Sequence, residues 1–353
     1  MILVAFGTRP EIIKLFPVIK ELSARQIPFR TLFSGQQLDL YEDMRELVPE
    51  PDFSFAGFFA GNEKHNSLAA SFVKICRAAE DLFTAHDFDI VLVQGDTTTA
   101  WAIAQIAFYN GVRVAHVEAG LRTFDLQNPY PEELNRTLIT RVAALNFSPT
   151  EQARKNLEEC GAQNIHVTGN TIVDAVHYFQ NRISPPAAQG ENIVVVTLHR
   201  RENHGIMDLL FDELQNAALS NPDLTFILPI HPNPAVARHR SRLKAENIRI
   251  IEPLGYPEML ALMARAKFFI SDSGGVQEEA SCLNKKILIV RDKTERPEIL
   301  EIGLGLLTGK DFRRHIEWAR TVPPAAATSP YGDGKAARRI VNILETAMRK
   351  GEV

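Results

Sequence analysis

Short apolar runs alternate with longer amphipathic stretches along the whole chain. Runs such as Ile2–Phe6 and Ile193–Thr197 are continuously apolar, as expected of strands buried on both faces of a parallel sheet. The pattern predicts six strands in each half of the chain. They are expected at Ile2–Phe6, Phe29–Phe33, Ile90–Gln94, Val112–Val117, Leu145–Phe147 and Ile165–Val167, then at Ile193–Thr197, Phe226–Ile230, Ile248–Ile251, Phe268–Ser271, Ile287–Val290 and Gly305–Thr308.

Helical patterns lie between these strands, and the repeated strand–helix order predicts an α/β fold with parallel sheets. The segment 183–190 contains two prolines and a glycine and predicts an interdomain linker. We therefore expect two Rossmann-like, doubly wound domains facing a cleft, at 1–183 and 190–334. Helices are expected at Glu11–Ser23, Leu68–Phe83, Thr98–Asn110, Glu133–Ala143, Pro257–Ala266, Val276–Leu283 and Lys335–Arg349.

Composition excludes several classes of protein. The 353 residues suit two domains, and 45% hydrophobic with 23% charged residues is typical of globular proteins. A net charge of -4 disfavours a nucleic-acid binder. The sequence has no apolar run of about 18 residues and no signal-peptide pattern, which predicts no membrane association and a cytoplasmic location. Three scattered cysteines disfavour a disulfide framework and a CxxC metal site.

Candidate functional residues follow the strand ends, where open α/β sheets bind their ligands. In the first half, Gly7–Glu11 follows the first strand and contains Arg9, with Lys14 one helical turn on. Arg9 is either a ligand contact or a solvated loop cation. Asp96 follows Gly95 at the next such strand end and is either a reactive acid or the N-cap of the following helix.

Glu118 ends another apolar strand, where a carboxylate is costly to bury without a partner. It therefore either pairs with a cation such as Arg122 or Arg136, or acts on a substrate. Glu132 and Glu133 open the following helix. Favourable interaction with the helix dipole explains one of these two acids easily, but not the whole string of polar residues.

The second half repeats this arrangement. His199 follows its first strand and is a candidate general acid/base, and Arg200 and Arg201 beside it suit anions. His231 follows the second strand and is either a ligand contact or a turn residue.

The segment Asp272–Ala280 is the most informative. Glycines 274 and 275 allow a ligand to approach the backbone, and the helix that follows offers N–H groups for a diphosphate. Glu278 or Glu279 can accept hydrogen bonds from ribose hydroxyls, and Arg296 adds a cation near another strand end. Neither a Walker loop nor a GxGxxG fingerprint in the right context occurs, so no nicotinamide cofactor is indicated.

Eight motifs in this order resemble the bacterial non-hydrolysing UDP-N-acetylglucosamine 2-epimerases, over nearly the full length. That resemblance implies a glycosyltransferase-B type fold, a last helix (335–353) that joins the first domain, and a homodimer. It also implies reversible conversion of UDP-GlcNAc to UDP-ManNAc without cofactor or metal. The motifs are GTRPE at 7–11, QGDT at 94–97, HVEAGLRT at 116–123, PEELNR at 131–136, HRREN at 199–203, DSGGVQEEA at 272–280, TERPE at 294–298 and YGDGKA at 331–336.

The resemblance also implies roles for single residues in an elimination and re-addition of UDP. Asp96, Glu118 and Glu132, with His199, match the family's acid/base set, and which carboxylate serves which face of C2 stays open. The matching substrate-binding residues are Arg9, Lys14, Arg136, His231, Leu254, Tyr256, Ser273, Gly274, Gly275, Glu279 and Arg296.

One segment departs from the family pattern. Relatives carry Gln-His there and bind an activating second UDP-GlcNAc, whereas Gln37 replaces the histidine here, which disfavours that activation. The candidate regulatory residues at this place are Gln36, Gln37 and Asp39. Three rival functions stay open from the sequence: a glycosyltransferase of the same fold, a hydrolysing epimerase that releases ManNAc and UDP, and a non-catalytic nucleotide-sugar sensor.

Overall fold

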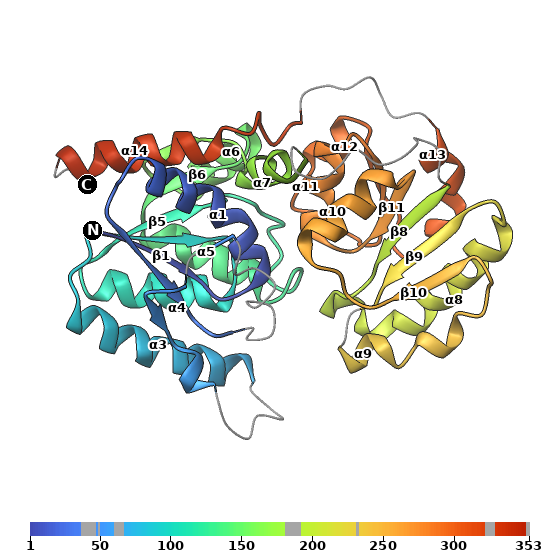
Figure 1. Cartoon of the computed structure of the whole chain (residues 1–353), viewed down its shortest axis with the longest axis horizontal. Helices are drawn as coiled ribbons and strands as arrows, with labels where there is room; N and C mark the ends of the chain where they lie inside the picture. The colour runs from blue at the N-terminus through green and yellow to red at the C-terminus, as the bar shows by residue number, and fades with distance from the viewer. Residues whose placement is uncertain are drawn as a thin grey trace. The chain divides into compact units, whose positions relative to one another are not determined.

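The computed structural model describes residues 1–36, 47–48, 50–59, 67–180, 192–230, 233–321 and 329–350. The chain divides into two compact units (Figure 1), Met1–Ala175 with Tyr331–Val353, and Val176–Pro330. This division falls within helix α7 (Thr171–Gln180). The expected linker at 183–190 lies outside the described residues, and the domain limits at 183 and 190 stay a prediction.

The first unit contains one parallel sheet with the strand order β3-β2-β1-β4-β5-β6-β7. All six strands predicted for this half are present, with ends shifted by at most two residues. The count of six is too low, because the two-residue strand β3 adds a seventh and is too short to leave an apolar run. The strands are β1 (Ile2–Phe6), β2 (Phe29–Phe33), β3 (Phe53–Ser54), β4 (Ile90–Gln94), β5 (Arg113–Val117), β6 (Ala143–Ser148) and β7 (Ile165–Val167).

Helices cover this sheet, as the alternating pattern predicts. They begin close to the expected positions, and Thr97 and Thr150 cap two of them by accepting a hydrogen bond from a backbone N–H. They are α1 (Arg9–Ala24), α3 (Leu68–Ala85), α4 (Thr98–Tyr109), α5 (Glu132–Val142), α6 (Glu151–Glu159), α7 and α14 (Ala336–Lys350), with a short 3₁₀ turn, η1 (Ala56–Phe58).

The second unit contains a six-stranded parallel sheet with the order β10-β9-β8-β11-β12-β13. Its strands are β8 (Ile193–Thr197), β9 (Thr225–Pro229), β10 (Ile248–Ile251), β11 (Phe268–Ser271), β12 (Lys286–Ile289) and β13 (Gly305–Leu307). Its helices and 3₁₀ turns are η2 (Arg201–Ile206), α8 (Met207–Ser220), α9 (Pro234–Ala237), η3 (Arg240–Arg242), α10 (Tyr256–Arg265), α11 (Gly274–Cys282), α12 (Glu298–Glu301), η4 (Phe312–His315) and α13 (Ile316–Arg320).

Both strand orders are those of a Rossmann-like, doubly wound sheet, which confirms the predicted fold class. The chain reverses its direction across the sheet between β1 and β4 in the first unit and between β8 and β11 in the second. Ligands of such sheets bind outside the strand ends at this switch point. The loops that leave these four strands begin at Gly7, Gly95, Leu198 and Asp272, so the candidate residues cluster where the topology favours binding.

Strands buried on both faces hold each sheet in place. In β8, Val194 and Val196 contribute to one apolar cluster, whereas Ile193 and Val195 contribute to a second cluster. Successive side chains of a strand point to opposite faces, so one continuous apolar run supplies two cores. This is the arrangement that the unbroken apolar pattern predicts.

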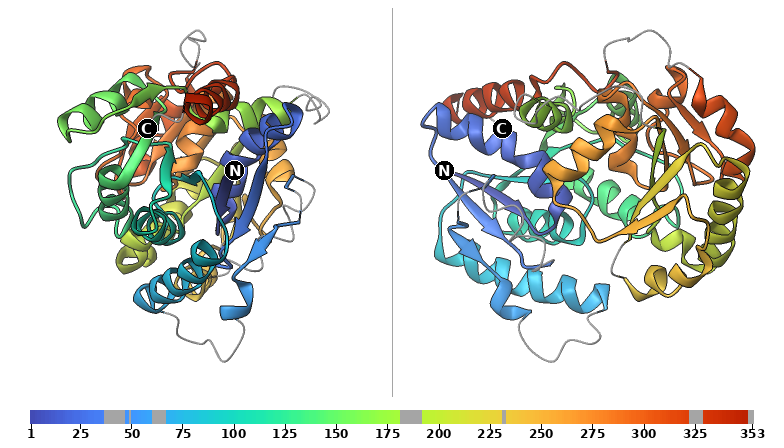
Figure 2. Two further views of the ribbon diagram at one scale, coloured as in Figure 1. Left: turned by 90° about the vertical axis from the view of Figure 1, so that its left-hand side faces the viewer. Right: turned by 45° about the vertical axis from the view of Figure 1, so that its right-hand side comes forward.

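The final helix, α14, belongs to the first unit and lies beside α1 (Figures 1 and 2). Asp174 in α7 accepts hydrogen bonds from the backbone N–H groups of Ala336 and Ala337, at 3.1 and 3.0 Å, and so caps the start of α14. Arg25, just after α1, donates to the Asn342 side chain at 2.5 Å. The C-terminal helix is thus fixed to the first unit by polar contacts at its first turn and along its length.

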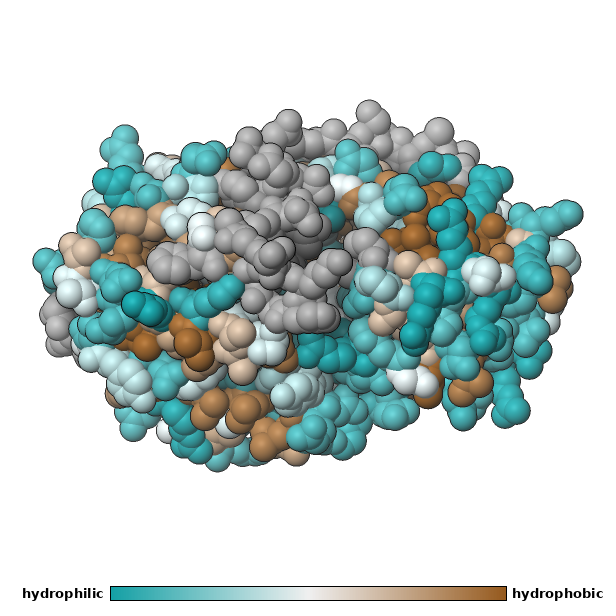
Figure 3. Space-filling model, turned by 90° about the horizontal axis from the view of Figure 1, so that it is seen from below, coloured by the Kyte–Doolittle hydropathy of each residue, from teal (hydrophilic) through white to brown (hydrophobic). Residues whose placement is uncertain are grey.

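The surface of the described residues is mixed in character. Figure 3 shows one face, where hydrophobic side chains lie among hydrophilic ones. None of the helices in the described ranges has both the length and the apolar character needed to cross a membrane.

Two glycines of the first unit, Gly120 and Gly111, both have a positive φ but differ in their surroundings. Gly120 has a φ of 94°, and a Cβ added there would lie 2.2 Å from the carbonyl oxygen of Ala153. Gly111 also has a positive φ, 73°, but a Cβ there would meet nothing within 4 Å. The pair separates backbone strain from steric overlap.

We expect Gly120→Ala to lower the free energy of unfolding by about 1–3 kcal/mol more than Gly111→Ala, because only the former overlaps a fixed backbone atom. Urea unfolding followed by Trp101 fluorescence, in a Trp318→Phe background, would report on the first unit, because the two tryptophans of the chain lie one in each unit. Equal losses in the two variants would contradict this packing.

Glu11 links the turns that follow β1 and β4. Its buried carboxylate accepts hydrogen bonds from the Gly7 N–H at 3.1 Å and from the Thr8 and Thr97 hydroxyls, both at 2.7 Å. Complete burial outweighs these bonds and raises the pKa of Glu11 from 4.5 to about 7. Between pH 4.5 and 7 the folded state therefore keeps a proton that the unfolded state releases.

This proton uptake predicts that Glu11 makes the protein less stable as pH rises through that window. Relative to Glu11→Gln, the free energy of unfolding of the wild type should fall by about 2 kcal/mol between pH 5 and pH 7. The same Trp101 fluorescence assay at the two pH values measures it. If the free energy of unfolding of the wild type, relative to that of Glu11→Gln, stays constant or rises between pH 5 and pH 7, then Glu11 is ionised throughout this range.

Candidate active site

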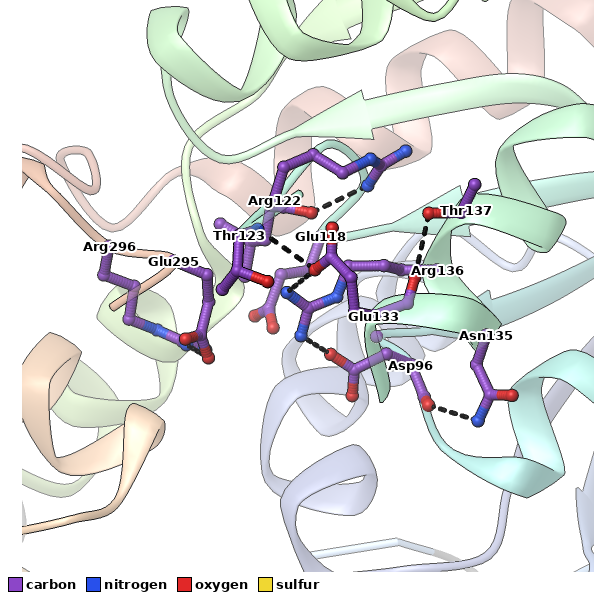
Figure 4. Close-up of polar contacts among 12 residues, drawn as sticks. Asp96, Glu118, Arg122, Thr123, Glu133, Asn135, Arg136, Thr137, Glu295 and Arg296 are labelled. Atoms are coloured by element: carbon purple, nitrogen blue, oxygen red, sulfur yellow. Dashed lines mark hydrogen bonds and ion pairs between the residues drawn. The ribbon is translucent and has the colours of Figure 1, made fainter. Parts of the chain in front are cut away.

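Each unit carries its own group of candidate residues, and we describe the two groups separately. In the first unit, Asp96 follows β4 and its carboxylate forms an ion pair with Arg136 of α5 (Figure 4). Asn135 donates to the Asp96 carbonyl at 2.9 Å. The side chain of Asp96 keeps 23% of its surface exposed, whereas that of Arg136 keeps 4%. Asp96 is thus held by α5 while its carboxylate still reaches solvent.

Asp96 is not the N-cap of α4, which was its alternative role. The N-cap is Thr97, whose hydroxyl accepts a hydrogen bond from the Ala100 N–H at 2.9 Å. The acid is therefore not needed to start the helix. Its position beyond the end of β4 requires another explanation, and the ion pair with Arg136 supplies part of it.

Glu118 lies directly after β5 with a φ of 65°, in the left-handed region that non-glycine residues seldom occupy. Its carboxylate pairs with Lys14 of α1 and accepts a hydrogen bond from Asn170 at 3.0 Å. Pairing with Arg122 or Arg136 was the structural alternative, and Lys14 is the cation found. The unusual backbone turns a buried acid toward a cation from another element, a kind of strain common at functional sites.

The two acids that open α5 have different surroundings. Glu133 is buried and accepts hydrogen bonds from the backbone N–H groups of Thr123 and Phe124, both at 3.1 Å, while Arg136 donates to it at 3.2 Å (Figure 4). It therefore fixes the loop that follows β5. Glu132, the predicted reactive acid, is only partly buried. Glu133, whose positioning role the sequence analysis missed, could have been suspected from its i,i+3 spacing to Arg136.

Arg122 is buried, and its guanidinium donates to the Thr140 hydroxyl and to the backbone carbonyl of Leu121, both at 2.7 Å. Burial lowers its pKa. Its contacts are those of a structural residue.

The remaining candidates of this unit lie around α1 and α4. Arg9 is the first residue of α1 and is half-buried. Gln36, a candidate regulatory residue, accepts hydrogen bonds from the Thr99 N–H at 3.2 Å and the Thr99 hydroxyl at 2.7 Å. Gln37 and Asp39 lie outside the described residues. Gln36 is therefore tied to the first turn of α4, the helix that begins just after Asp96.

In the second unit, buried Asp272 organises the loop after β8. Its carboxylate accepts hydrogen bonds from the N–H groups of His199 (3.0 and 3.1 Å) and Arg200 (2.9 Å), and from the Asn203 side chain at 3.0 Å. Half-buried His199 is thus placed by an acid that is not among the residues predicted from the sequence. The signal was present, since Asp272 opens the DSGGVQEEA motif.

The glycine turn lies at the start of α11, where Ser273 is the N-cap and makes no side-chain capping bond. A Cβ at Gly274 would lie 2.5 Å from Nη1 of Arg296 and 3.3 Å from Nη2 of Arg200. At Gly275, a Cβ would meet nothing within 4 Å. Gly274 therefore allows two guanidinium groups to approach the N-terminal end of a helix, which favours an anion at that point.

A chain of paired charges, four of the five buried, holds Arg296 in place. Its Nε donates to Glu278 at 2.6 Å, and its Nη1 pairs with Glu295. Glu295 also pairs with Arg291 at 2.8 Å, and Arg291 donates to Glu202 at 2.6 Å. The five side chains alternate in sign, so each buried charge has a partner of opposite sign. Arg291, completely buried, was missed because a lone arginine after a strand carries no motif.

Two other candidates of the second unit, Leu254 and Tyr256, lie at the start of α10. Tyr256 is buried, its ring packs edge-on against Phe179 with centroids 5.4 Å apart, and burial together with the charge of Glu279 raises its pKa. Its hydroxyl therefore faces Glu279 at the α11 helix. Leu254 is half-buried, and His231 lies outside the described residues.

No group of three His, Cys, Asp or Glu side chains that could hold a metal ion is present among the described residues. The polar groups of both units consist instead of paired acids, guanidinium groups and a helix N-terminus. Such a set can transfer protons and bind a phosphate-bearing anion.

Comparisons with known proteins agree with this chemistry. The model of the family described as UDP-N-acetylglucosamine 2-epimerase matches residues 20–345. The Bacillus subtilis and Campylobacter jejuni UDP-N-acetylglucosamine 2-epimerases are 38% and 36% identical, over 97% of this chain and 94% and 97% of their own lengths. The crystal structure of the Neisseria meningitidis UDP-GlcNAc 2-epimerase bound to UDP-GlcNAc is similar with a TM-score of 0.90 at 32% identity, covering 98% of this chain and 99% of that one.

Each of these relatives covers nearly the whole chain, and the family model spans both compact units. The chain therefore belongs to the UDP-N-acetylglucosamine 2-epimerase family.

Proposed function

We propose that this protein interconverts UDP-GlcNAc and UDP-ManNAc by a non-hydrolysing route, in which UDP is eliminated and then added back. Family membership supports the substrate, and relatives have been solved with UDP-GlcNAc and with UDP bound. The observation that carries the proposal is the pairing of Asp96 and Glu118 with Arg136 and Lys14 at the switch point of the first sheet.

The chemistry explains why several acids are needed. The C2 proton of the sugar is weakly acidic because no carbonyl is conjugated with it. Elimination across C1–C2 requires a base at C2 and stabilisation of the departing diphosphate. Re-addition then requires a proton delivered to C2 from the other face.

The first unit is proposed to supply the proton-transfer groups. A neighbouring cation favours the ionised form of a carboxylate, so Asp96 and Glu118 are both prepared to accept a proton. Glu132 is proposed as the third acid of this set. Arg9, Lys14 and Arg136 would hold the sugar and the diphosphate.

The second unit is proposed to hold the leaving group. Ser273, Gly274 and Gly275 present the N-terminal end of α11, and Arg296 lies against the same turn. His199 would assist at the diphosphate, Glu279 would bind ribose, and Leu254 with Tyr256 would contact the uracil. His231 is proposed as a further substrate contact.

Assembly, location and regulation are further parts of the proposal. A homodimer is supported by exposed apolar side chains on the adjacent helices α3 and α4, with Val73 63%, Phe108 52% and Tyr109 70% exposed. A cytoplasmic location is supported by three cysteines that all remain unpaired. A regulatory site including Gln36, Gln37 and Asp39 stays a prediction.

We expect Asp96→Asn, Glu118→Gln and His199→Asn each to lower kcat by roughly 100-fold or more. The first two remove proposed proton-transfer groups, and the third removes the group that assists at the departing diphosphate. Proton NMR of UDP-GlcNAc in heavy water measures both UDP-ManNAc formation and loss of the C2 proton signal. Exposed Asp87→Asn, which carries the same change of charge, serves as the control.

Near-normal turnover in all three variants would contradict the mechanism. Free ManNAc and UDP as the wild-type products would identify a hydrolysing enzyme instead. A wild type that binds UDP-GlcNAc without exchanging the C2 proton would favour a transferase or a sensor.

We expect Gly274→Ala to weaken UDP binding by roughly tenfold, or about 1.4 kcal/mol. The new methyl group would overlap Arg296 Nη1, which Glu295 and Glu278 prevent from moving away. Isothermal titration calorimetry with UDP measures the affinity. Gly205→Ala in η2 is the matched control, since its Cβ would meet nothing within 4 Å. Equal affinities for the two variants would be evidence against a diphosphate at this turn.

A further inference from the structure

His116 is a buried histidine that the proposed mechanism does not use. It is the last residue but one of β5, opposite Val93 of β4. Its side chain is completely buried, and its Nε2 lies 2.7 Å from the carbonyl oxygen of Gly95. The ring thus reaches from one strand to the turn that follows its neighbour.

The protonation state of this ring follows from its surroundings. Burial lowers the pKa of His116 to about 4, and the nearby Arg122 and Arg136 act in the same direction while Asp96 opposes them. The imidazole is therefore neutral at neutral pH. Because a carbonyl oxygen can only accept, Nε2 carries the hydrogen and donates it to Gly95.

Both polar groups of Gly95 are then held by β5. Its carbonyl accepts from His116, and its N–H donates to the carbonyl of Val117 at 3.0 Å. Gly95 has a φ of 69°, so the chain turns sharply there. The next residue is Asp96, whose carbonyl accepts from Asn135. The peptide before Asp96 and the carbonyl of Asp96 itself are therefore both fixed by side chains.

We propose that His116 is a positioning residue for Asp96: its Nε2–H fixes the Gly95 peptide so that the Asp96 carboxylate is aimed for proton transfer. This inference rests on the proposed function. A direct acid/base role does not fit, because the ring is fully buried and its proton is committed to a backbone carbonyl. A displacement of about 1 Å at a reacting group can lower the rate by about 100-fold. Loss of the bond from His116 to Gly95 is therefore expected to lower kcat if it moves the Asp96 carboxylate.

Two amide substitutions test the role of this single bond. In the His116→Gln variant, the side-chain amide nitrogen can occupy the position of Nε2 and donate to the Gly95 carbonyl. In the His116→Asn variant, the side chain is shorter and its nitrogen lies near the position of Nδ1. Both variants introduce the same neutral polar group into the same buried place. They differ mainly in whether the bond to Gly95 can form.

We expect His116→Asn to lower kcat by roughly 10- to 100-fold, with the KM for UDP-GlcNAc changed by less than about threefold. His116→Gln should recover kcat to within about threefold of the wild type. Loss of the C2 proton signal in heavy water should follow kcat in each variant. Urea unfolding followed by Trp101 fluorescence compares the stability of the variants. Calorimetric titration with UDP shows whether each variant still binds UDP.

Wild-type kcat in His116→Asn, or a His116→Gln variant no faster than His116→Asn, would overturn the inference. An equal loss of kcat and of folded protein in both variants would assign His116 a purely structural role and also overturn it. A wild type that exchanges no C2 proton would instead overturn the proposed function. The wild-type measurement therefore separates the two failures.

Discussion

A carboxylate at the end of a buried strand is stable only when cations or N–H donors surround it, and both units are organised by this constraint. The free-energy penalty for removing an ionised acid from water without a partner is several kcal/mol. Parallel sheets concentrate strand ends at one edge, so acids placed there for binding or catalysis need partners from other elements. The contacts of Asp96, Glu118, Glu133 and Asp272 each satisfy that requirement in a different way.

Individual acids have different partners. Side-chain cations from α1 and α5 face Glu118 and Asp96 in the first unit. Asp272 of the second unit is surrounded by backbone N–H groups and an amide. A cationic partner favours the ionised form of a carboxylate, which is the form that accepts a proton. Asp272 instead accepts hydrogen bonds from several groups of one loop and so fixes that loop.

Backbone N–H donors distinguish the two acids that position loops. Glu133 and Asp272 are deeply buried, and their oxygens hold loops at 123–124 and 199–203. Asp96 keeps a partly exposed side chain beside a buried arginine. His116 belongs with the positioning groups, because it acts on the backbone before Asp96 and its burial keeps it neutral. The proposed reactive groups are thus supported by a larger set of buried positioning groups.

The sequence by itself determined the fold class, the strands other than β3, and the segments in which the candidate residues lie. It could do so because apolar runs, glycine turns and strand-end acids are local features, and local features survive in the order of residues. Only the tertiary structure decided that Glu118 pairs with Lys14, 104 residues away, that Thr97 rather than Asp96 caps α4, and that Arg291 supports Arg296 through Glu295. Lys14 and Glu118 come from elements distant in sequence, and whether such charges meet depends on how helices pack against a sheet, a property that no single segment of the chain contains. The other two contacts are local, but which of several neighbouring polar side chains makes them depends on the conformation of the folded loop.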